Sequence, residues 1–377
     1  MASVKRRPDG RWRARYRDEA GKEHARHFDR KLDGQRWLDE VTASAVTGTY
    51  VDPRAGLITF ACFFTEWSER QVWATGTDRA MRLAARTVTF ADVPLKSLRR
   101  SHIESWIKAM QTADRGEGRS RGLAPGTIKT RVNNVRSVLR AAVRDRIIPS
   151  DPSEGVTLPR PRRAQAAMVL PTPVQVRAVL ETAGDDFRPF VALAAFAGLR
   201  LGEAAAVQLG DVDFLRRTLQ VTRQVQRGPG GTVEITPPKY GSERPVFLAV
   251  GLVDELAAHV ARQAVQGRTA WLFCGEGQDP PHQNTVGHRW RRTCRAAGVE
   301  GVTLHDLRHF YASGLIAQGC DVVTVQRALG HAKASTTLNT YSHLWPTAED
   351  RTRSAADSLI AETLADQVRT AGPRKVG

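Results

Sequence analysis

Six prolines lie between residues 149 and 173, in the middle of a chain whose two flanking halves resemble ordinary globular protein. Proline removes a backbone donor and clashes with the preceding helical turn, so this density ends helices and extends the chain. The same stretch contains the basic segment Arg160-Pro161-Arg162-Arg163. For 377 residues, at roughly 150 residues per domain, we expect two or three domains with a linker here.

Positive charge dominates the composition, because 56 Lys and Arg against 39 Asp and Glu give a formal net charge of +17. The excess is spread along the chain, and a polyanion is its natural partner. The longest apolar run, residues 190–199, is ten residues long, about half of the roughly 20 that a bilayer span needs. The basic N-terminus leads into no apolar segment. We therefore expect a folded cytoplasmic protein without a membrane segment.

The cysteines are scattered and form no C-x-x-C pair, which argues against a disulfide framework and a zinc ribbon. They are Cys62, Cys274, Cys294 and Cys320. The sequence also has no phosphate loop of the G-x-x-x-x-G-K-[ST] type and no H-E-x-x-H helix. These absences disfavour ATP-driven and zinc-hydrolase chemistry, so we expect neither a metal ion nor a cofactor.

The first fifty residues predict a small β-rich module with a covering helix. After the turn signal Pro8-Asp9-Gly10, apolar and basic residues alternate with a period of two, which is typical of a half-buried strand. The basic face carries Arg11, Arg13, Arg15 and Arg17. A solvated face is one interpretation. Four neighbouring guanidinium groups repel each other unless an anion lies against them, so a phosphate-contacting sheet is favoured.

Residues 57–150 predict a bundle of about four short helices, because apolar positions recur at spacings of three and four. The last of these helices, residues 127–146, combines an apolar face with a basic one. The basic residues that we expect to contact a DNA backbone are Lys129, Arg131 and Arg136. A merely solvated face is the alternative, and the overall charge favours DNA contact.

Beyond the linker the pattern predicts a larger α+β unit. We expect helices at about 173–183 and 187–206, strands at 218–226, 232–237 and 244–248, and mainly helices to about 368. Arg, Lys and His recur here at turns and helix starts next to apolar runs, where an anion would be held. His305 and Arg308 are three residues apart, so on a helix they share a face and could share a ligand.

Five segments of this second half form an ordered set. They are Ala197-Gly198-Leu199-Arg200-Leu201-Gly202-Glu203, then Lys239 between two expected strands, then His305-Asp306-Leu307-Arg308-His309, then Leu329-Gly330-His331, and finally Tyr341. Chance assembly of all five in this order is improbable. The set resembles the tyrosine recombinase (phage-type integrase) family. The residue after Lys239 departs from the family, which often has Thr or Asn where this chain has Tyr240.

The resemblance covers almost the whole chain and implies a multidomain fold, mainly α with α+β parts. Residues 1–50 are then an arm-type DNA-binding module with a three-stranded sheet and a helix. Residues 57–150 are a helical core-binding (SAM-like) domain. Residues 168–377 are a mixed α+β catalytic domain with a C-terminal tail helix.

The chemistry that the resemblance implies is transesterification without metal or nucleotide. Tyr341 would attack a scissile phosphodiester, form a 3′-phosphotyrosine bond and expel a 5′-hydroxyl. Arg200 and Arg308 would hold the non-bridging oxygens, because the planar guanidinium donates two hydrogen bonds and stays protonated. His305 and His331 would donate hydrogen bonds or carry a proton, and Lys239 would protonate the leaving oxygen.

Two further residues are expected to support this site from outside it. His309 would buttress the pocket, and Glu203 would orient an arginine. A phenol with a pKa near 10 needs a proton acceptor before it can attack. The sequence does not decide which residue is this general base, because His305 and Lys239 could divide the proton transfers in more than one way.

The C-terminal segment predicts an amphipathic helix, with Ala355, Leu359, Ile360, Leu364 and Val368 at helical spacing. Packing on its own domain is one alternative. The resemblance implies docking into a neighbouring protomer, in a homotetramer on paired double-stranded DNA sites of core and arm type. Arm-binding integrases commonly use an excisionase and a host DNA-bending protein, and the sequence leaves open whether this chain does.

The sequence therefore favours the integrase of a phage or integrative mobile element in a bacterial host, acting through a Holliday junction. A housekeeping recombinase that resolves chromosome or plasmid dimers typically lacks an arm module. A non-catalytic DNA-binding regulator would not need the complete residue set. A type IB topoisomerase, which uses similar chemistry, is disfavoured by the integrase-like amino-terminal half.

Overall fold

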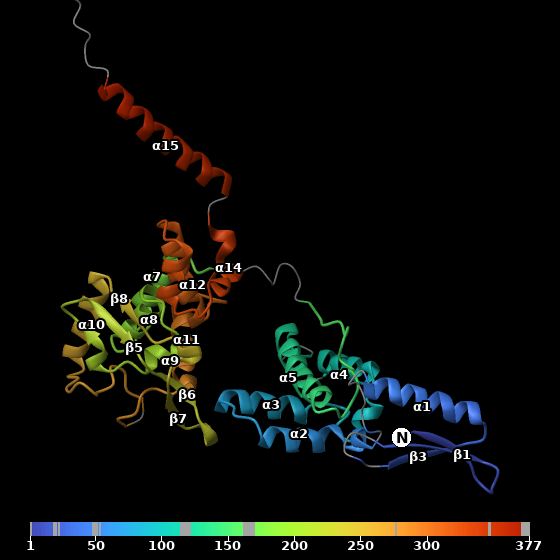
Figure 1. The fold of residues 1–377 in the computed structure, drawn as a ribbon. Helices are drawn as coiled ribbons and strands as arrows, with labels where there is room; N and C mark the ends of the chain where they lie inside the picture. The colour runs from blue at the N-terminus through green and yellow to red at the C-terminus, as the bar shows by residue number, and fades with distance from the viewer. Residues whose placement is uncertain are drawn as a thin grey trace, which may run out of the picture. The chain divides into compact units, whose positions relative to one another are not determined.

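The computed structural model describes residues 2–17, 21, 23–46, 52, 54–113, 122–160, 170–275, 277–345 and 348–370. The chain divides into two compact units, Met1–Ala167 and Met168–Gly377. The boundary falls within the proline-rich stretch, of which Pro161 to Arg163 lie outside the described residues. Residues 149–160 contain neither helix nor strand, as the prolines predict. Each unit is described by itself below (Figure 1).

The chain begins with a three-stranded antiparallel sheet in the order β1-β2-β3, covered by a helix. The elements are β1 (Ser3–Arg6), β2 (Trp12–Arg17), β3 (Glu23–Phe28) and α1 (Lys31–Val46). Ala14 and Tyr16 of β2 are buried against Leu38 of α1. The alternation in β2 thus has the predicted physical basis, because successive side chains of a strand point to opposite faces.

The predicted helical bundle follows in the same unit. Its elements are η1 (Ala55–Leu57), α2 (Phe60–Glu69), α3 (Thr75–Arg86), η2 (Leu95–Ser97), α4 (Arg100–Thr112) and α5 (Pro125–Arg144). Phe60, Phe90 and Trp106 meet edge to face at the centre of its core. The helix α5 starts with Pro125 in its first turn, where a missing backbone N–H costs no hydrogen bond.

The second unit packs helices around two small sheets, β4-β5-β8 and β6-β7. Its first helices are α7 (Pro173–Thr182), α8 (Arg188–Phe196) and α9 (Leu201–Ala205), followed by η3 (Leu209–Asp211). The strands are β4 (Val212–Asp213), β5 (Thr218–Val221), β6 (Gln224–Arg227), β7 (Val233–Thr236) and β8 (Arg244–Phe247), with η4 (Pro229–Gly231) and η5 (Lys239–Gly241) between them. The strands are followed by α10 (Val250–Arg262), α11 (Gln283–Ala296), α12 (Leu304–Ala317), α13 (Val322–Leu329) and α14 (Ala334–Tyr341). They are followed by η6 (Ser342–Leu344) and α15 (Ala348–Thr370).

The helix α8 is the centre of this unit, because it packs against both α10 and α12 (Figure 1). Its residues 189–195 are all buried. This explains why the longest apolar run of the sequence occurs here. Among the described helices none is both long enough and apolar enough to cross a membrane.

Two predicted elements of this unit are divided in the structure. The expected helix 187–206 is broken at Gly198, whose φ of +64° belongs to the left-handed region. A Cβ there would lie 2.5 Å from Cδ1 of Tyr311. The expected strand 218–226 is two strands, β5 and β6, that belong to different sheets. Both breaks depend on tertiary contacts that local periodicity does not contain.

Candidate active site

A pocket of about 510 Å³ in the second unit brings together Arg200, His305, Arg308, His331 and Tyr341. These residues come from the start of α9, from α12, from the turn after α13 and from the end of α14. The pocket therefore joins segments up to 141 positions apart in the sequence. Its wall is rich in cationic and imidazole groups, a composition suited to an anion.

Arg200 enters the pocket because the chain breaks at Gly198 and restarts as α9, with Arg200 as the residue before the first turn. Its Nη1 donates to Oε1 of Glu203 at 2.6 Å and to Oγ of Ser242 at 3.3 Å. Its Nη2 lies 3.4 Å from the carbonyl oxygen of Gly330. The guanidinium is therefore fixed before any ligand arrives.

Glu203 is buried, and its carboxylate binds two arginines at once. Besides Arg200, it accepts hydrogen bonds from Nη2 of Arg244 at 3.0 Å and from Nη1 at 3.3 Å. Burial by itself raises the pKa of Glu203, but the hydrogen bonds and charge of Arg244, with the charge of Arg200, outweigh it and hold the pKa below its usual value. The orienting role expected of Glu203 thus extends to a second arginine.

Arg308 lies on α12 and is only 1% exposed. Its Nη1 donates to the carbonyl of Gly198 and its Nη2 to the carbonyl of Leu329. Burial and the nearby charge of Arg200 lower its pKa to about 9. The side chain is still protonated at neutral pH, so it supplies a buried positive charge between the α8–α9 turn and the end of α13.

His331 follows the turn that ends α13. Gly330 has a φ of +63° there, and a Cβ on it would lie 2.8 Å from Cδ of Arg244. Nδ1 of His331 is 2.9 Å from Oγ1 of Thr337. Burial, followed by the charges of Arg308 and Arg200, lowers the pKa of His331 to about 4. The ring is therefore neutral at physiological pH and can donate one hydrogen bond.

Tyr341 ends α14 and is 1% exposed. Its ring packs with Ala312, Ile316, Val325 and Leu329 in a small apolar cluster. Burial raises its pKa to about 12. The hydroxyl is thus fully protonated at neutral pH and held by a rigid ring at the wall of the pocket.

Two histidines lie one helical turn apart on α12, where positions i and i+4 face the same way. His305 is open to solvent at one edge, and its ring centroid lies 4.7 Å from that of His309. Partial burial and the charges of His309 and Arg308 lower the pKa of His305 to about 4. The sequence placed His309 outside the pocket as a buttress, whereas the structure places it in the wall with its Nδ1 2.6 Å from Oη of Tyr341.

Lys239 does not line this pocket with the other predicted residues. It is exposed and begins η5, between β7 and β8. These two strands belong to different sheets, so Lys239 does not lie at the tip of a hairpin between them. The hairpin in this region is β6-β7, which ends before Lys239.

Three residues at or near the pocket were not predicted from the sequence to belong to the site. Ser242 and Arg244 reach Arg200 and Glu203 from the segment after Lys239. Lys333 lines the pocket itself, just before α14. The S-x-R pattern after Lys239 and the cation two residues after His331 were the available signals.

The residues expected to bind DNA in the first unit have several internal partners. Arg13 and Arg15 both pair with Glu23, at 3.1 and 3.5 Å. Arg11 lies 3.4 Å from Asp29, while Arg17 and Lys129 are exposed. Arg131 is half-buried on α5.

Arg136 has a structural partner that the helix pattern could not predict. Its Nη2 donates to the carbonyls of Ser153 and Val156, at 3.2 and 3.1 Å. The side chain therefore ties α5 to the segment that follows the bundle, and it is less available for a phosphate than Lys129.

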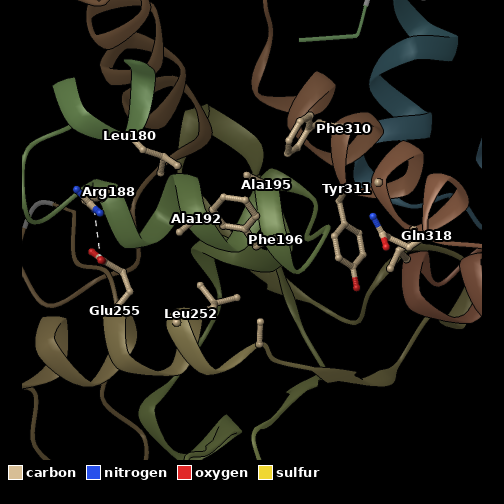
Figure 2. A pocket seen from close by; sticks show the side chains of 14 residues that line it. Leu180, Arg188, Ala192, Ala195, Phe196, Leu252, Glu255, Phe310, Tyr311 and Gln318 are labelled. Carbon is tan, nitrogen blue, oxygen red and sulfur yellow. Dashed lines mark ion pairs between the residues drawn. The ribbon is translucent and has the colours of Figure 1, made fainter. Parts of the chain in front are cut away.

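A second hollow of about 510 Å³ shares no lining residue with the charged pocket (Figure 2). Its wall is mainly apolar, with Leu180, Phe196, Leu252 and Phe310 from α7, α8, α10 and α12. Arg188 and Glu255 form an ion pair of 3.3 Å at its edge. This composition suits an apolar side chain and not a phosphate.

Within the described residues, no three His, Cys, Asp or Glu side chains are grouped so that they could hold a metal ion. The donors in the charged pocket are guanidinium, imidazole, ammonium, hydroxyl and phenol groups. The arrangement can bind an anion, neutralise charge that develops on it and present a hydroxyl nucleophile.

Comparisons with known proteins agree with this chemistry. Residues 172–347 match the phage integrase family. The putative prophage phiRv2 integrase of Mycobacterium tuberculosis is 24% identical over 94% of this chain and 94% of its own length. The Tn1549 transposon integrase, solved with a circular intermediate DNA, superposes with a TM-score of 0.66 at 19% identity, over 80% of this chain and 99% of that one. A lambda integrase tetramer bound to a Holliday junction gives a TM-score of 0.50 at 17% identity, over 89% and 94%.

The matched family region contains every residue of the charged pocket, from Arg200 to Tyr341. The relative from a prophage extends the similarity over nearly the full length. Residues 172–347 therefore match the phage integrase family, and the chain is similar to a prophage integrase over 94% of its length and to XerC tyrosine recombinases over 58%.

Proposed function

We propose that this chain is the site-specific integrase of a phage or integrative mobile element, and that it cuts and rejoins DNA through a 3′-phosphotyrosine bond to Tyr341. The observation that supports this most strongly is the shared pocket, in which Oη of Tyr341 lies with two arginines and two of the expected histidines. A single backbone phosphate in that pocket would meet both the nucleophile and the groups that stabilise its charge.

Arg200 and Arg308 act on the non-bridging oxygens of the phosphate. Attack by the phenol oxygen creates a phosphorane with more negative charge than the diester, and fixed donors stabilise it without reorganisation. Glu203, Ser242 and the carbonyl of Gly330 already hold Arg200 in place. His305 and His331 add neutral donors at the same oxygens.

Lys239 protonates the leaving 5′ oxygen in this proposal. Lys239 is exposed at the start of η5, shortly before Ser242 and Arg244, which contact Arg200 and Glu203. A long flexible side chain at this position can reach a DNA strand that lies across the pocket mouth. A Lys239→Ala variant should then cleave DNA slowly only when the substrate has a leaving group that must be protonated.

Strand exchange through a Holliday junction requires several protomers, and we propose a homotetramer on core-type sites. The described side chains of α15 are exposed, including Leu359, Ile360 and Leu364 at 64, 57 and 52%. The apolar hollow beside α8 and α10 offers a matching surface on a second copy (Figure 2). Substituting these three residues by Ser is expected to leave DNA binding intact and to abolish the tetramer on paired sites, measured by light scattering.

The three-stranded sheet of residues 1–50 binds a second, arm-type DNA site in this proposal. The basic face of β2 supplies the phosphate contacts. An excisionase and a host DNA-bending protein are further partners, since they could bring arm and core sites together. Deleting residues 1–50 is expected to stop integration between attachment sites while leaving core cleavage intact. Unchanged integration would favour a housekeeping recombinase.

The decisive experiment traps the covalent intermediate on nicked suicide duplexes. A pool randomised around the nick supplies the probe, and sequences recovered in protein adducts are then used individually. The wild type should give an adduct that survives denaturation, with or without EDTA. Tyr341→Phe should give none, while Tyr311→Phe, a tyrosine elsewhere on α12, should still react. An adduct with Tyr341→Phe would refute the assignment.

A further inference from the structure

We propose that His309 is the group that accepts the proton of Tyr341 when the phenol oxygen attacks the phosphate. This inference rests on the proposed function and adds a residue to it. The sequence favoured His305 or Lys239 for this task and placed His309 outside the reaction. The positions of His305 and His309 on α12, relative to Tyr341 on α14, reverse the roles that the sequence favoured for these two histidines.

The contact itself is short and specific. Nδ1 of His309 lies 2.6 Å from Oη of Tyr341, within the range of a strong hydrogen bond. The two rings meet at 63° with centroids 5.5 Å apart, so the imidazole edge faces the hydroxyl. With the phenol donating, Nδ1 accepts and the imidazole proton lies on Nε2. A base must lie within hydrogen-bond reach of its proton, and His309 does.

Tyr341 needs such a base more than an exposed tyrosine would. Burial raises its pKa to about 12, which leaves roughly one phenolate in 10⁵ molecules at pH 7. The ring is clamped by Ile316, Val325 and Leu329, so its hydroxyl has little freedom to find another acceptor. The partner it already has is the one that can take its proton.

His309 is prepared to accept that proton. Burial and the charge of Arg308 lower its pKa, while Asp306 opposes them. The charged or titratable groups around the pair are His305, Asp306 and Arg308 on α12, Arg200 before α9, and His331 and Lys333 before α14. The imidazole is therefore neutral at physiological pH, and a phosphate that enters beside Arg200 and Arg308 would favour its protonated form.

His305 occupies a different position on the same face. It lies one turn earlier, open to solvent at the pocket edge, and meets the side of the His309 ring at 81°. That position suits a hydrogen bond to a phosphate oxygen. The histidine pair thus divides the work, with His305 on the phosphate and His309 on the nucleophile.

The step balances without any further reactant. The Oη–P bond forms while the P–O5′ bond breaks. The phenolic proton passes to Nδ1 of His309, giving an imidazolium, and Lys239 delivers a proton to the departing 5′ oxygen. Religation runs the same transfers backwards, so the imidazolium of His309 returns its proton to the phenol oxygen as the phosphotyrosine bond breaks.

The test compares His309→Gln with His305→Gln and Lys239→Ala in the full chain. Glutamine keeps an acceptor near Tyr341 but cannot take up a proton at neutral pH. Each variant is measured by single-turnover adduct formation on the recovered suicide duplex, with either oxygen or sulfur as the 5′ bridging atom. Sulfur leaves without needing an acid. Circular dichroism and denaturant unfolding check that the variants fold.

We expect His309→Gln to cleave the oxygen substrate about 10²- to 10⁴-fold more slowly, the usual contribution of a general base. Sulfur should not restore it, whereas sulfur should restore Lys239→Ala. The pH profile separates proton transfer from positioning. The wild-type rate should level off above the lowered pKa of His309, whereas the variant's rate should keep rising toward the Tyr341 pKa of about 12.

Three results would overturn the inference: cleavage by His309→Gln within twofold of wild type, rescue of that variant by sulfur, or a wild-type pH profile in the variant. The first would show that a hydrogen-bond acceptor suffices, and the second would make His309 an acid. Each can occur while Tyr341 still forms the adduct, so they leave the proposed function standing. Loss of Tyr341 dependence would instead refute the proposed function.

Discussion

Glu203 and Glu23 each bind two arginines, yet their surroundings differ completely. Glu203 joins Arg200 and Arg244 beside the charged pocket, and its side chain is 1% exposed. Glu23 joins Arg13 and Arg15 on the amino-terminal sheet, and its side chain is 31% exposed. The cluster of one carboxylate and two guanidinium groups is thus buried at Glu203 and exposed to solvent at Glu23.

The difference teaches what each cluster can do. Beside the pocket the buried carboxylate of Glu203 is dehydrated and cannot exchange its partners for water, so the arginines stay fixed for catalysis. On the sheet both Arg13 and Arg15 remain about 40% exposed, and exposed pairs are worth little. Those arginines can leave Glu23 for a phosphate at small cost.

The largest expected contrast is in stability, when each glutamate is replaced by alanine. Glu203→Ala leaves Arg244 buried without its carboxylate, which should lower the free energy of unfolding by about 3–5 kcal/mol. Glu23→Ala should lower it by less than about 1 kcal/mol. Urea unfolding of the two full-length variants, followed by fluorescence, measures both.

Acidification sharpens the same result. The pKa of Glu203 is held below its usual value, so its contribution is present above about pH 4.5 and is lost as the pH falls through the lowered pKa. The wild type should therefore lose stability in acid more steeply than Glu203→Ala does. Equal acid sensitivity in the two proteins would show that the buried carboxylate does not link pH to folding.

The next contrast concerns arginine geometry and affects activity. Arg200→Lys keeps the charge but loses the fork that reaches Glu203, Ser242 and the phosphate together, so adduct formation should fall by about 10²- to 10³-fold. Arg13→Lys should leave arm-DNA affinity within about twofold, because a screened phosphate contact needs charge more than shape. Single-turnover cleavage and filter binding provide the two readouts. If Arg200→Lys retained full activity, the preorganised pocket would lose its main support.

Much of the pocket was accessible from the sequence because its residues lie in short local motifs. The H-x-L-R-H pattern places His305 and Arg308 on one helical face through the 3.6-residue period alone. The alternation in β2 likewise predicted which side chains face α1. In both cases the information needed lies within one element.

The remaining features depend on where separate segments meet. The contact between His309 and Tyr341 joins residues 32 positions apart, and Arg244 reaches Glu203 across 41. At Gly198, where α8 and α9 are separated, a side chain would collide with the ring of Tyr311 from another helix. The helix pattern predicts that Arg136 faces DNA, whereas in the structure it donates to the carbonyls of Ser153 and Val156. No periodicity encodes such encounters.

The smallest expected effect tests the exposed cluster directly. Glu23→Gln removes the charge that Arg13 and Arg15 share, while the amide keeps the size of the side chain. Both arginines then become available to phosphate, so affinity for duplex DNA should rise a few-fold. The salt dependence should steepen by about 0.9 for each additional phosphate neutralised.

The matched variant is Asp29→Asn, which releases only Arg11 from its 3.4 Å contact. It should steepen the salt dependence of DNA affinity by half as much as Glu23→Gln does. Fluorescence anisotropy on the same duplex over a salt series measures both. Both changes require that these arginines already face DNA across the sheet. If neither substitution changes the salt dependence of DNA affinity, the outer face of β2 does not contact the DNA backbone. The arginines beside Glu23 would then not be exchangeable partners of DNA phosphates, unlike what the contrast with Glu203 requires.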